Sequence, residues 1–134
     1  MSDRETHAPK GPDGILLCQD LIFTSKITGT ARELGYRVLV AGTDPLAQSM
    51  LEQWRPKVVL VDLSHPHFAK PDVLLAYRKI VPTARFLAFG SHVDVKSLSA
   101  ARDVGCDPVL PRSKFTAELP ELIQTYLGEA SCET

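Results

Sequence analysis

The sequence has few cysteines, and no two of them stand at a metal-binding or redox spacing. Its three cysteines, Cys18, Cys106 and Cys132, are odd in number and far apart. The sequence therefore predicts neither a disulfide framework nor a zinc ribbon. Cys18 stands inside an apolar run, where the simplest interpretation is a small buried thiol.

An excess of charge of one sign is also missing. Fifteen lysines and arginines stand against sixteen acids in 134 residues, which gives a formal net charge of −1. Such a balance creates no long-range field toward nucleic acid or an acidic membrane surface, so we expect neither as a partner. A chain of this length forms one domain whose core buries about two thirds of the surface of the unfolded chain.

Long hydrophobic runs are absent as well. No apolar run approaches the roughly 20 residues that a membrane helix needs, and the opening "MSDRETHAPKGPDG" has no apolar centre for a signal peptide. We therefore expect a cytoplasmic protein. The sequence also contains no G-x-G-x-x-G, no phosphate-loop lysine motif and no G-x-S-x-G, so we predict no enzyme activity.

Both ends of the chain are polar and rich in small residues. Residues 1–13 and 128–134 are predicted to be tails, which leaves 14–127 as the folded part. Within it, five short apolar runs favour strands, and they cover 15–18, 37–41, 58–62, 85–89 and 108–110. The stretches between them carry apolar residues at helical spacing, which predicts a helix after each strand.

Helix ends are marked by a few residues. Gly35 can end the first helix in the left-handed conformation. Asp44 is the expected N-cap of the second helix, with Pro45 in its first turn. The last helix is expected to start near Thr116, because Pro120 then lies in the first turn, where its missing N–H costs little.

Strands that alternate with helices predict an α/β fold, a doubly wound parallel sheet of five strands with five helices covering both faces. In the flavodoxin-like order 2-1-3-4-5, ligands bind beyond the carboxyl ends of the strands where the strand order reverses. Asp20 follows the first strand and Asp62 ends the third, so this topology would bring the two carboxylates together.

The run "VVLVDLSHP" supports a specific resemblance. It has an apolar strand, then Asp62, with Leu63 next and Pro66 four places on. With the later "DVGCDPVL" turn, it resembles the receiver domain of bacterial two-component response regulators, the CheY-like fold, over residues 15–127. The resemblance implies a module of phosphorelay signal transduction in which Asp62 is the phosphoacceptor, and Asp20 and Asp62 hold Mg²⁺.

The same alignment shows departures from the family pattern. Gln19 replaces the first metal-binding acid, and Gly90 stands where the family has a phosphoryl-binding hydroxyl, with Ser91 one place late. Arg112 takes the place of the lysine that pairs with the phosphoryl group. Val109 takes the place of the aromatic residue that signals phosphorylation.

These departures indicate a degenerate or pseudo-receiver that binds Mg²⁺ weakly and acts by protein–protein recognition. The resemblance implies a signalling partner, namely a histidine kinase, a phosphotransfer protein or an output protein. It also implies a contact face, formed by helix four, strand five and helix five, that could hold a homodimer and is flanked by Lys96, Arg102 and Glu121. We expect no output domain in this sequence. The alternative is a working receiver phosphorylated at Asp62.

A different class of function stays open, a flavodoxin-like protein that binds a small molecule or a metal. The stretch "TSKITGTA" (24–31) is similar to the flavodoxin phosphate loop, although its apolar spacing favours a helix. His65, His67 and His92 lie in loops after neighbouring strands, where they could bind a transition metal.

Overall fold

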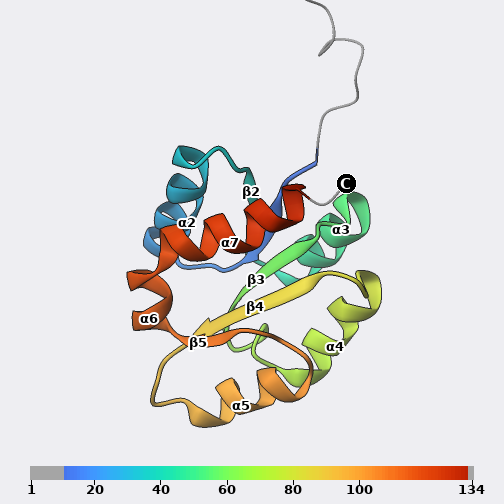
Figure 1. The fold of residues 1–134 in the computed structure, drawn as a ribbon. Coiled ribbons are helices and arrows are strands. Elements are labelled where there is room, and N and C mark those ends of the chain that lie inside the picture. Colours follow the sequence, from blue (N-terminus) through green and yellow to red (C-terminus); the bar gives the residue numbers. More distant parts are fainter. Residues whose placement is uncertain (1–10, 133–134) are drawn as a thin grey trace, which may run out of the picture.

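The structure, a computed structural model, describes residues 11–132 and shows a five-stranded parallel sheet in the order β2-β1-β3-β4-β5 (Figure 1). This confirms the predicted doubly wound fold. The strand bounds differ from the predicted ones by a residue at some ends. They are β1 Gly14–Leu17, β2 Val38–Ala41, β3 Val58–Asp62, β4 Arg85–Gly90 and β5 Val109–Pro111.

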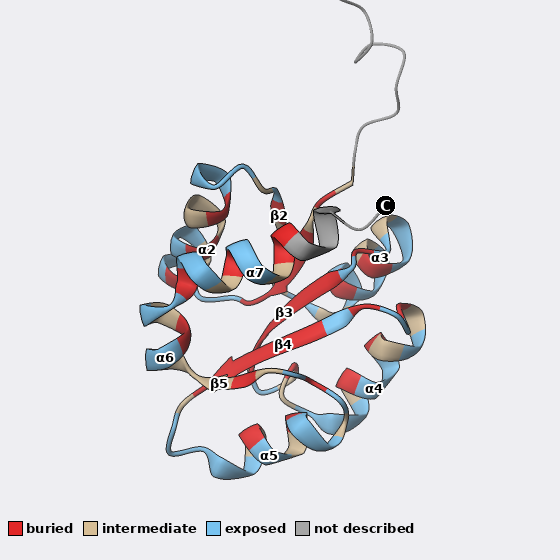
Figure 2. Ribbon diagram, in the orientation of Figure 1, coloured by how far each residue is buried: buried red, intermediate tan, exposed pale blue. Residues whose placement is uncertain are grey.

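Helices cover both faces of the sheet and bury its apolar side chains (Figures 1 and 2). One face packs against α2 (Leu21–Glu33), α6 (Arg112–Ala117) and α7 (Leu119–Cys132). The other packs against α3 (Asp44–Trp54), α4 (Pro71–Ile80) and α5 (Val95–Asp103). Because both faces are covered, β3 is buried along its whole length, as its unbroken apolar run predicts. No helix within residues 11–132 is both long and apolar enough to cross a membrane.

The described part of the chain has six helices and not the predicted five. The stretch expected to form the last helix is divided at Glu118 into α6 and α7. In one continuous helix, Pro120 would lie in the interior, where a proline costs about 3 kcal/mol. The break places Pro120 in the first turn of α7, where no intrahelical N–H is needed. The last helix then continues to Cys132, beyond the expected end of the folded part at residue 127, while residues 1–10 of the expected tail lie outside the described part.

The predicted helix ends are partly confirmed. Gly35 follows α2 with a φ of +92°, and the N–H of Tyr36 donates to the carbonyl of Ala31, as in a left-handed C-terminal cap. The N-cap prediction for α3 is wrong by one residue. Thr43 is the cap and accepts the N–H of Leu46, while Asp44 lies in the first turn.

Asp44 instead links α3 to α4. The Tyr77 side chain is fully buried, and its hydroxyl donates to Asp44 Oδ1. This hydrogen bond lowers the pKa of Asp44 below its ordinary value of 3.8, while burial and then the same bond raise the pKa of Tyr77. His67 Nε2 also lies 3.3 Å from Asp44 Oδ1, so the loop after β3 joins the same cluster.

We predict that Tyr77→Phe lowers the free energy of unfolding by about 1 kcal/mol near neutral pH. A hydrogen bond to a charged group contributes about 1.5–3 kcal/mol, and the partly exposed Asp44 puts this one below that range. Because the folded pKa of Asp44 is depressed, its contribution is present above pH 3.8 and is lost as pH falls through the folded pKa. Urea unfolding at about pH 7 and about pH 3 measures the difference.

In acid, the two proteins should therefore approach equal stability. His67 lies beside Asp44 in both proteins, so this contact is common to the two sides of the comparison. A stability loss that is the same at both pH values would contradict the proposed link between Asp44 and Tyr77.

Candidate functional site

The site lies at the carboxyl ends of the strands, where Asp62 ends β3. This strand lies between β1 and β4, beside the reversal of strand order. Asp62 is 3 % exposed, and it is the one charged side chain found buried in the described core. A buried carboxylate is stable only when its charge is paired and its oxygens are hydrogen-bonded, so its neighbours define the site.

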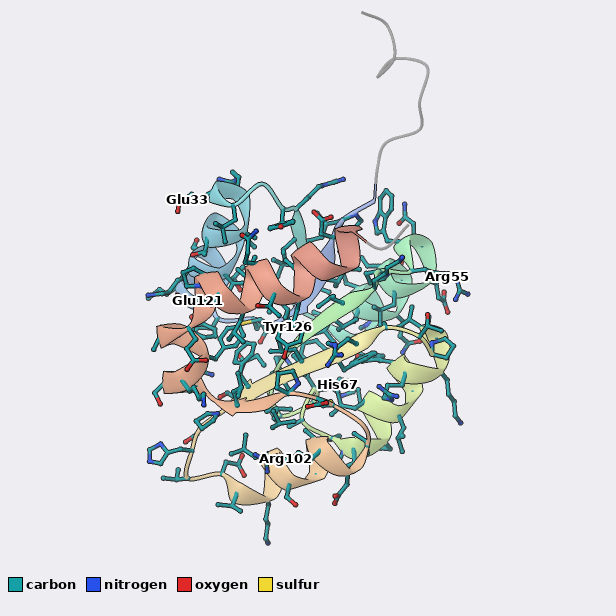
Figure 3. The ribbon with its side chains drawn as sticks, viewed as in Figure 1. Glu33, Arg55, His67, Arg102, Glu121 and Tyr126 are labelled. Atoms are coloured by element: carbon teal, nitrogen blue, oxygen red, sulfur yellow. The ribbon has the colours of Figure 1, made fainter. Side chains whose placement is uncertain are left out.

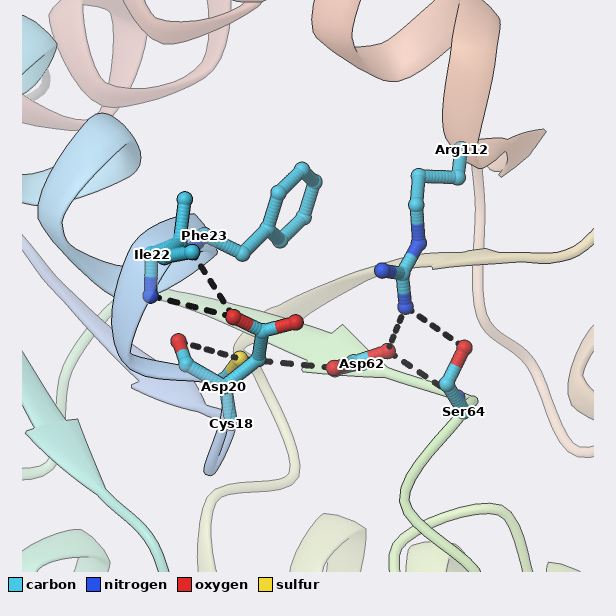
Figure 4. Close-up of polar contacts among 7 residues, drawn as sticks. All are labelled: Cys18, Asp20, Ile22, Phe23, Asp62, Ser64 and Arg112. Carbon is cyan, nitrogen blue, oxygen red and sulfur yellow. Dashed lines mark hydrogen bonds and ion pairs between the residues drawn. The ribbon is translucent and has the colours of Figure 1, made fainter.

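Both carboxylate oxygens of Asp62 have protein partners (Figure 4). Oδ1 accepts a hydrogen bond of 3.0 Å from Arg112 Nη2 and one of 2.9 Å from the backbone N–H of Ser64. Oδ2 accepts from the thiol of Cys18, with Sγ 3.3 Å away. The charge of Asp62 is thus offset by one arginine, and no oxygen is left without a donor.

Arg112 reaches Asp62 from the start of α6, across the end of the sheet. Its guanidinium carbon lies 4.8 Å from the ring centre of Phe23, close enough for a cation–π contact. The same Nη2 also donates to the hydroxyl of Ser64. An aromatic face and two oxygens therefore fix this cation in place.

Cys18 is a donor in this site. Burial raises the pKa of its thiol above 9.0, and the negative charge of Asp62 raises it further. The thiol therefore stays protonated at neutral pH, which the hydrogen bond to Asp62 requires.

Asp20 and Gln19 follow β1 at the rim of the site. Asp20 is the N-cap of α2, and its Oδ1 accepts the N–H groups of Ile22 and Phe23 at 3.0 and 3.1 Å. Gln19 donates from Nε2 to the carbonyl of Gly42, so its amide is drawn toward the loop after β2. One oxygen of Asp20 is thus used by the helix that it caps.

The predicted convergence of Asp20 and Asp62 is visible as a shared cavity. The cavity measures about 400 Å³ and is called here the Asp62 cavity. Its lining combines two carboxylates and a guanidinium with amide, hydroxyl and imidazole groups. The lining residues are Gln19, Asp20, Asp62, Ser64, His65, Pro66 and Arg112.

The donor set fits a divalent cation poorly. Within the described residues, no group of three or more His, Cys, Asp or Glu side chains could hold a metal ion. Mg²⁺ prefers octahedral oxygen ligands. Asp62 already accepts three hydrogen bonds and Asp20 caps a helix. A cation would have to displace Arg112 or share Asp62 with it.

Three other predicted site residues lie apart from the carboxylate of Asp62. Gly90 ends β4, where a β-carbon would meet Leu63 Cβ at 3.1 Å and Leu98 Cδ2 at 3.6 Å. The hydroxyl of Ser91 accepts the N–H of Val93 and lines a neighbouring cavity with Ser64 and Arg112. Val109 is buried in the core against α5.

The structure also bears on the predicted features of another class. The stretch 24–31 lies inside α2, so it is not a phosphate-binding loop. His65 uses Nδ1 to accept the N–H of His67, whose own ring lies beside Asp44. His92 lines the neighbouring cavity with Ser91, and the described side chains contain no metal-binding cluster that includes it.

Three contacts of the site were not predicted from the sequence. Ser64 binds both Asp62 and Arg112, Cys18 donates to Asp62, and Phe23 packs under Arg112. The backbone contact of Ser64 has a sequence signal, because an aspartate side chain often accepts the N–H of the residue two places on. Cys18 and Phe23 carry no such signal, because both look like ordinary core residues.

Comparison with solved structures identifies the fold. The chain is similar to a CheY-like response regulator receiver domain protein from Methanospirillum hungatei, with a TM-score of 0.76, 17% identity, and coverage of 95% of this chain and 100% of that one. It is also similar to the receiver domain of a sensor histidine kinase from Pseudomonas aeruginosa, solved with a magnesium ion in the active site cleft. That match has a TM-score of 0.73 and 20% identity, and covers 88% and 98% of the two chains.

A third match is a response regulator protein from Burkholderia pseudomallei with a phosphorylated aspartic acid, a calcium ion and citrate. Its TM-score is 0.71 at 18% identity, and the match covers 93% of this chain and 72% of that one. No family model and no curated protein matches the sequence. The fold is therefore that of receiver domains, at a low sequence identity.

The close packing at Gly90 leads to a prediction. Gly90→Thr should destabilise the protein by about 1–3 kcal/mol, the usual range when a well-packed core is overfilled. Leu63→Ala keeps the Cβ of residue 63 but removes Cδ1, which lies 3.7 Å from the position that the new β-carbon would take. This makes room for the γ atoms of threonine, so the double mutant should be more stable than the sum of the two single effects predicts. A double-mutant cycle of urea unfolding measures this coupling.

Strict additivity of the two substitutions would show that the outer carbons of Leu63 do not limit the space for a side chain at position 90. The pair Gly90→Thr and Leu74→Ala is a suitable control, since Leu74 is also fully buried but does not contact Gly90 in this way.

Proposed function

We propose that this protein is a receiver-like module of two-component signal transduction that acts by protein–protein recognition and not by catalysis, with its phosphoacceptor chemistry impaired. The observation that carries the proposal is the set of donors on Asp62. Arg112, Ser64 and Cys18 together donate to both oxygens of this buried carboxylate, and Asp20 is the one other acid that lines its cavity.

Phosphoryl transfer to Asp62 would require a lone pair on one carboxylate oxygen, and three of its roughly four lone-pair sites already accept hydrogen bonds. In the transfer, the attacking oxygen bonds to phosphorus while the phosphorus–oxygen bond of an acyl phosphate breaks, and the leaving carboxylate takes the electron pair. The attacking oxygen gives up its negative charge, so the transfer weakens at least one of these hydrogen bonds, each of which contributes about 1.5–3 kcal/mol. The metal that would offset the incoming charge has few ligands here, and the hydroxyl position is Gly90.

A working phosphoacceptor is the second candidate, and one observation favours it. Arg112 already lies 3.0 Å from Asp62, at the rim of an open cavity where a phosphoryl group could enter. A fork of five N–H donors suits phosphate as well as carboxylate. The neighbours with a magnesium ion or a phosphorylated aspartic acid show that this fold supports such chemistry in those proteins.

Intact mass spectrometry after incubation with acetyl phosphate and millimolar Mg²⁺ separates the two candidates. We expect little or no gain of one phosphoryl mass in the wild type. Gln19→Asp with Arg112→Lys should increase the gain, because the first substitution adds a metal ligand and the second leaves a more compact cation. Asp62→Asn in the same background is the control and should abolish it.

Rapid, near-complete phosphorylation of the wild type, abolished by Asp62→Asn, would overturn the proposal that phosphoacceptor chemistry is impaired and would establish the second candidate. A gain that survives Asp62→Asn would instead place the modification at another residue.

A separate prediction concerns the contact face of α5, β5 and α7. Lys96, Arg102 and Glu121 are exposed on this face, and Figure 3 labels the last two. We expect charge reversal at these positions to weaken self-association or capture of a cognate kinase or output protein at least about tenfold. Stability should change by only about 0.5 kcal/mol, as is usual for surface substitutions.

The matched control is charge reversal at Lys26 and Glu33, which are exposed on α2, outside the contact face of α5, β5 and α7. Sedimentation velocity measures self-association, and surface plasmon resonance measures capture of the cognate partner. If the α2 reversals weaken binding and the α5–α7 reversals do not, the contact face is the wrong one.

A further inference from the structure

A second cavity lies at the end of the sheet away from Asp62. It measures about 760 Å³ and opens at the amino ends of β3 and β4, beside the turn that leads into β5. This amino-end cavity is lined by residues from five segments of the chain, namely Lys57, Val58, Arg78, Thr83, Ala84, Arg85, Phe86, Gly105, Asp107 and Tyr126. Its volume is within the range of about 300–1,000 Å³ that small-molecule sites occupy.

The charge of the amino-end cavity is positive, although the whole chain is close to neutral. Three of its lining residues, Lys57, Arg78 and Arg85, are cations, and Asp107 is the one acid among them. Asp107 pairs loosely with Arg85, with 3.9 Å between Nη1 and Oδ2, and its side chain is 86% exposed to solvent. Solvent therefore screens this carboxylate, and it offsets little of the positive charge.

The two arginines are held in place by aromatic faces and by carbonyl groups. Arg78 lies 5.6 Å from the ring centre of Phe86 and donates from Nη1 to the carbonyl of Gly105. Arg85 lies 5.1 Å from the ring centre of Tyr126 and donates from Nη1 to the carbonyl of Asp107. Tyr126 is labelled in Figure 3, on α7 beside the sheet.

These contacts hold the turn between α5 and β5 in place, but they leave the positive charge of the two arginines without a buried anion beside it. A carbonyl oxygen satisfies one of the five N–H donors of a guanidinium and neutralises none of its charge. An aromatic face orients the guanidinium plane and leaves its edge donors available. Two oriented guanidinium groups at one cavity match the geometry of phosphate oxygens, which arginine binds in a bidentate manner.

We infer that the amino-end cavity binds a small anion that carries two or more phosphate groups. One phosphate would meet one arginine fork and fill a small part of 760 Å³, whereas a diphosphate can engage cations from both α4 and β4. The site is separate from Asp62, so the inference goes beyond the proposed signalling function and does not depend on it.

Isothermal titration with pyrophosphate tests the inference, and amide chemical shifts of the wild type locate the site. We expect binding with shifts at residues 83–86 and 105–107. Arg78→Gln and Arg85→Gln should each weaken affinity at least about tenfold, the loss that follows from removing a hydrogen bond to a charged group. Arg102→Gln is the matched control, because Arg102 is an exposed arginine that donates to the carbonyl of Val109 outside the cavity. It should bind like the wild type.

Parallel titrations distinguish the sources of the phosphate groups. ADP binding more tightly than pyrophosphate would identify a nucleotide, and equal affinities would identify the phosphates alone. Asp62→Asn should bind like the wild type, so this test can fail while the proposed function stands. Thermal melts without ligand show that each variant is folded.

Two outcomes would overturn the inference. One is a wild type that shows no pyrophosphate-induced shifts at 83–86 and 105–107 beyond those caused by sodium chloride of the same ionic strength. The other is an Arg102→Gln variant that loses as much affinity as Arg85→Gln. The amide shifts are measured on the wild type, so the first outcome can be reached even if an arginine variant does not fold.

Discussion

The burial of one carboxylate organises this end of the molecule. Asp62 is almost fully buried at the end of β3, so its charge must be met by groups of the protein. Arg112 meets it from the start of α6, while Cys18 supplies a neutral donor from the strand end beside it. The first turn of α2 contributes Phe23 beneath the arginine. Two segments that are far apart in sequence, the end of β1 with the start of α2 and the start of α6, thus meet around the carboxylate of Asp62.

The strands were predictable because their runs are mainly apolar, and β1 and β3 at the centre of the sheet are buried along their whole length. The parallel order followed from the alternation with helices, and Gly35 marked a helix end through its conformational freedom. The division of the last helix was missed, although Pro120 contained the reason for it. The cap of α3 was misplaced because Thr43 and Asp44 are both good capping residues, and only the backbone geometry distinguishes them.

Those parts of the candidate site that depend on strand order or on the resemblance to receiver domains could be predicted from the sequence. Strand ends brought Asp20 and Asp62 to one cavity, and the alignment pointed to Arg112. The donors Cys18 and Ser64, and the obstacle beside Gly90, depend on how side chains pack across the sheet. The same is true of the arginines at the amino-end cavity, which come from segments whose charges look like ordinary surface residues in the sequence.

The packing of Leu63 has a mechanical consequence for the loop that carries Ser64 and the histidines. Leu63 follows Asp62 directly, its side chain is buried against the bare backbone of Gly90, and its N–H donates to the carbonyl of Phe89. A displaced loop would have to withdraw this side chain, which costs about 2–3 kcal/mol, so roughly one molecule in thirty to one in a hundred and fifty would hold the displaced form at any moment. A partner that recognises the loop in the observed position finds it already formed in nearly every molecule. A partner that needs the displaced form binds with an apparent affinity that is only that fraction of its intrinsic affinity.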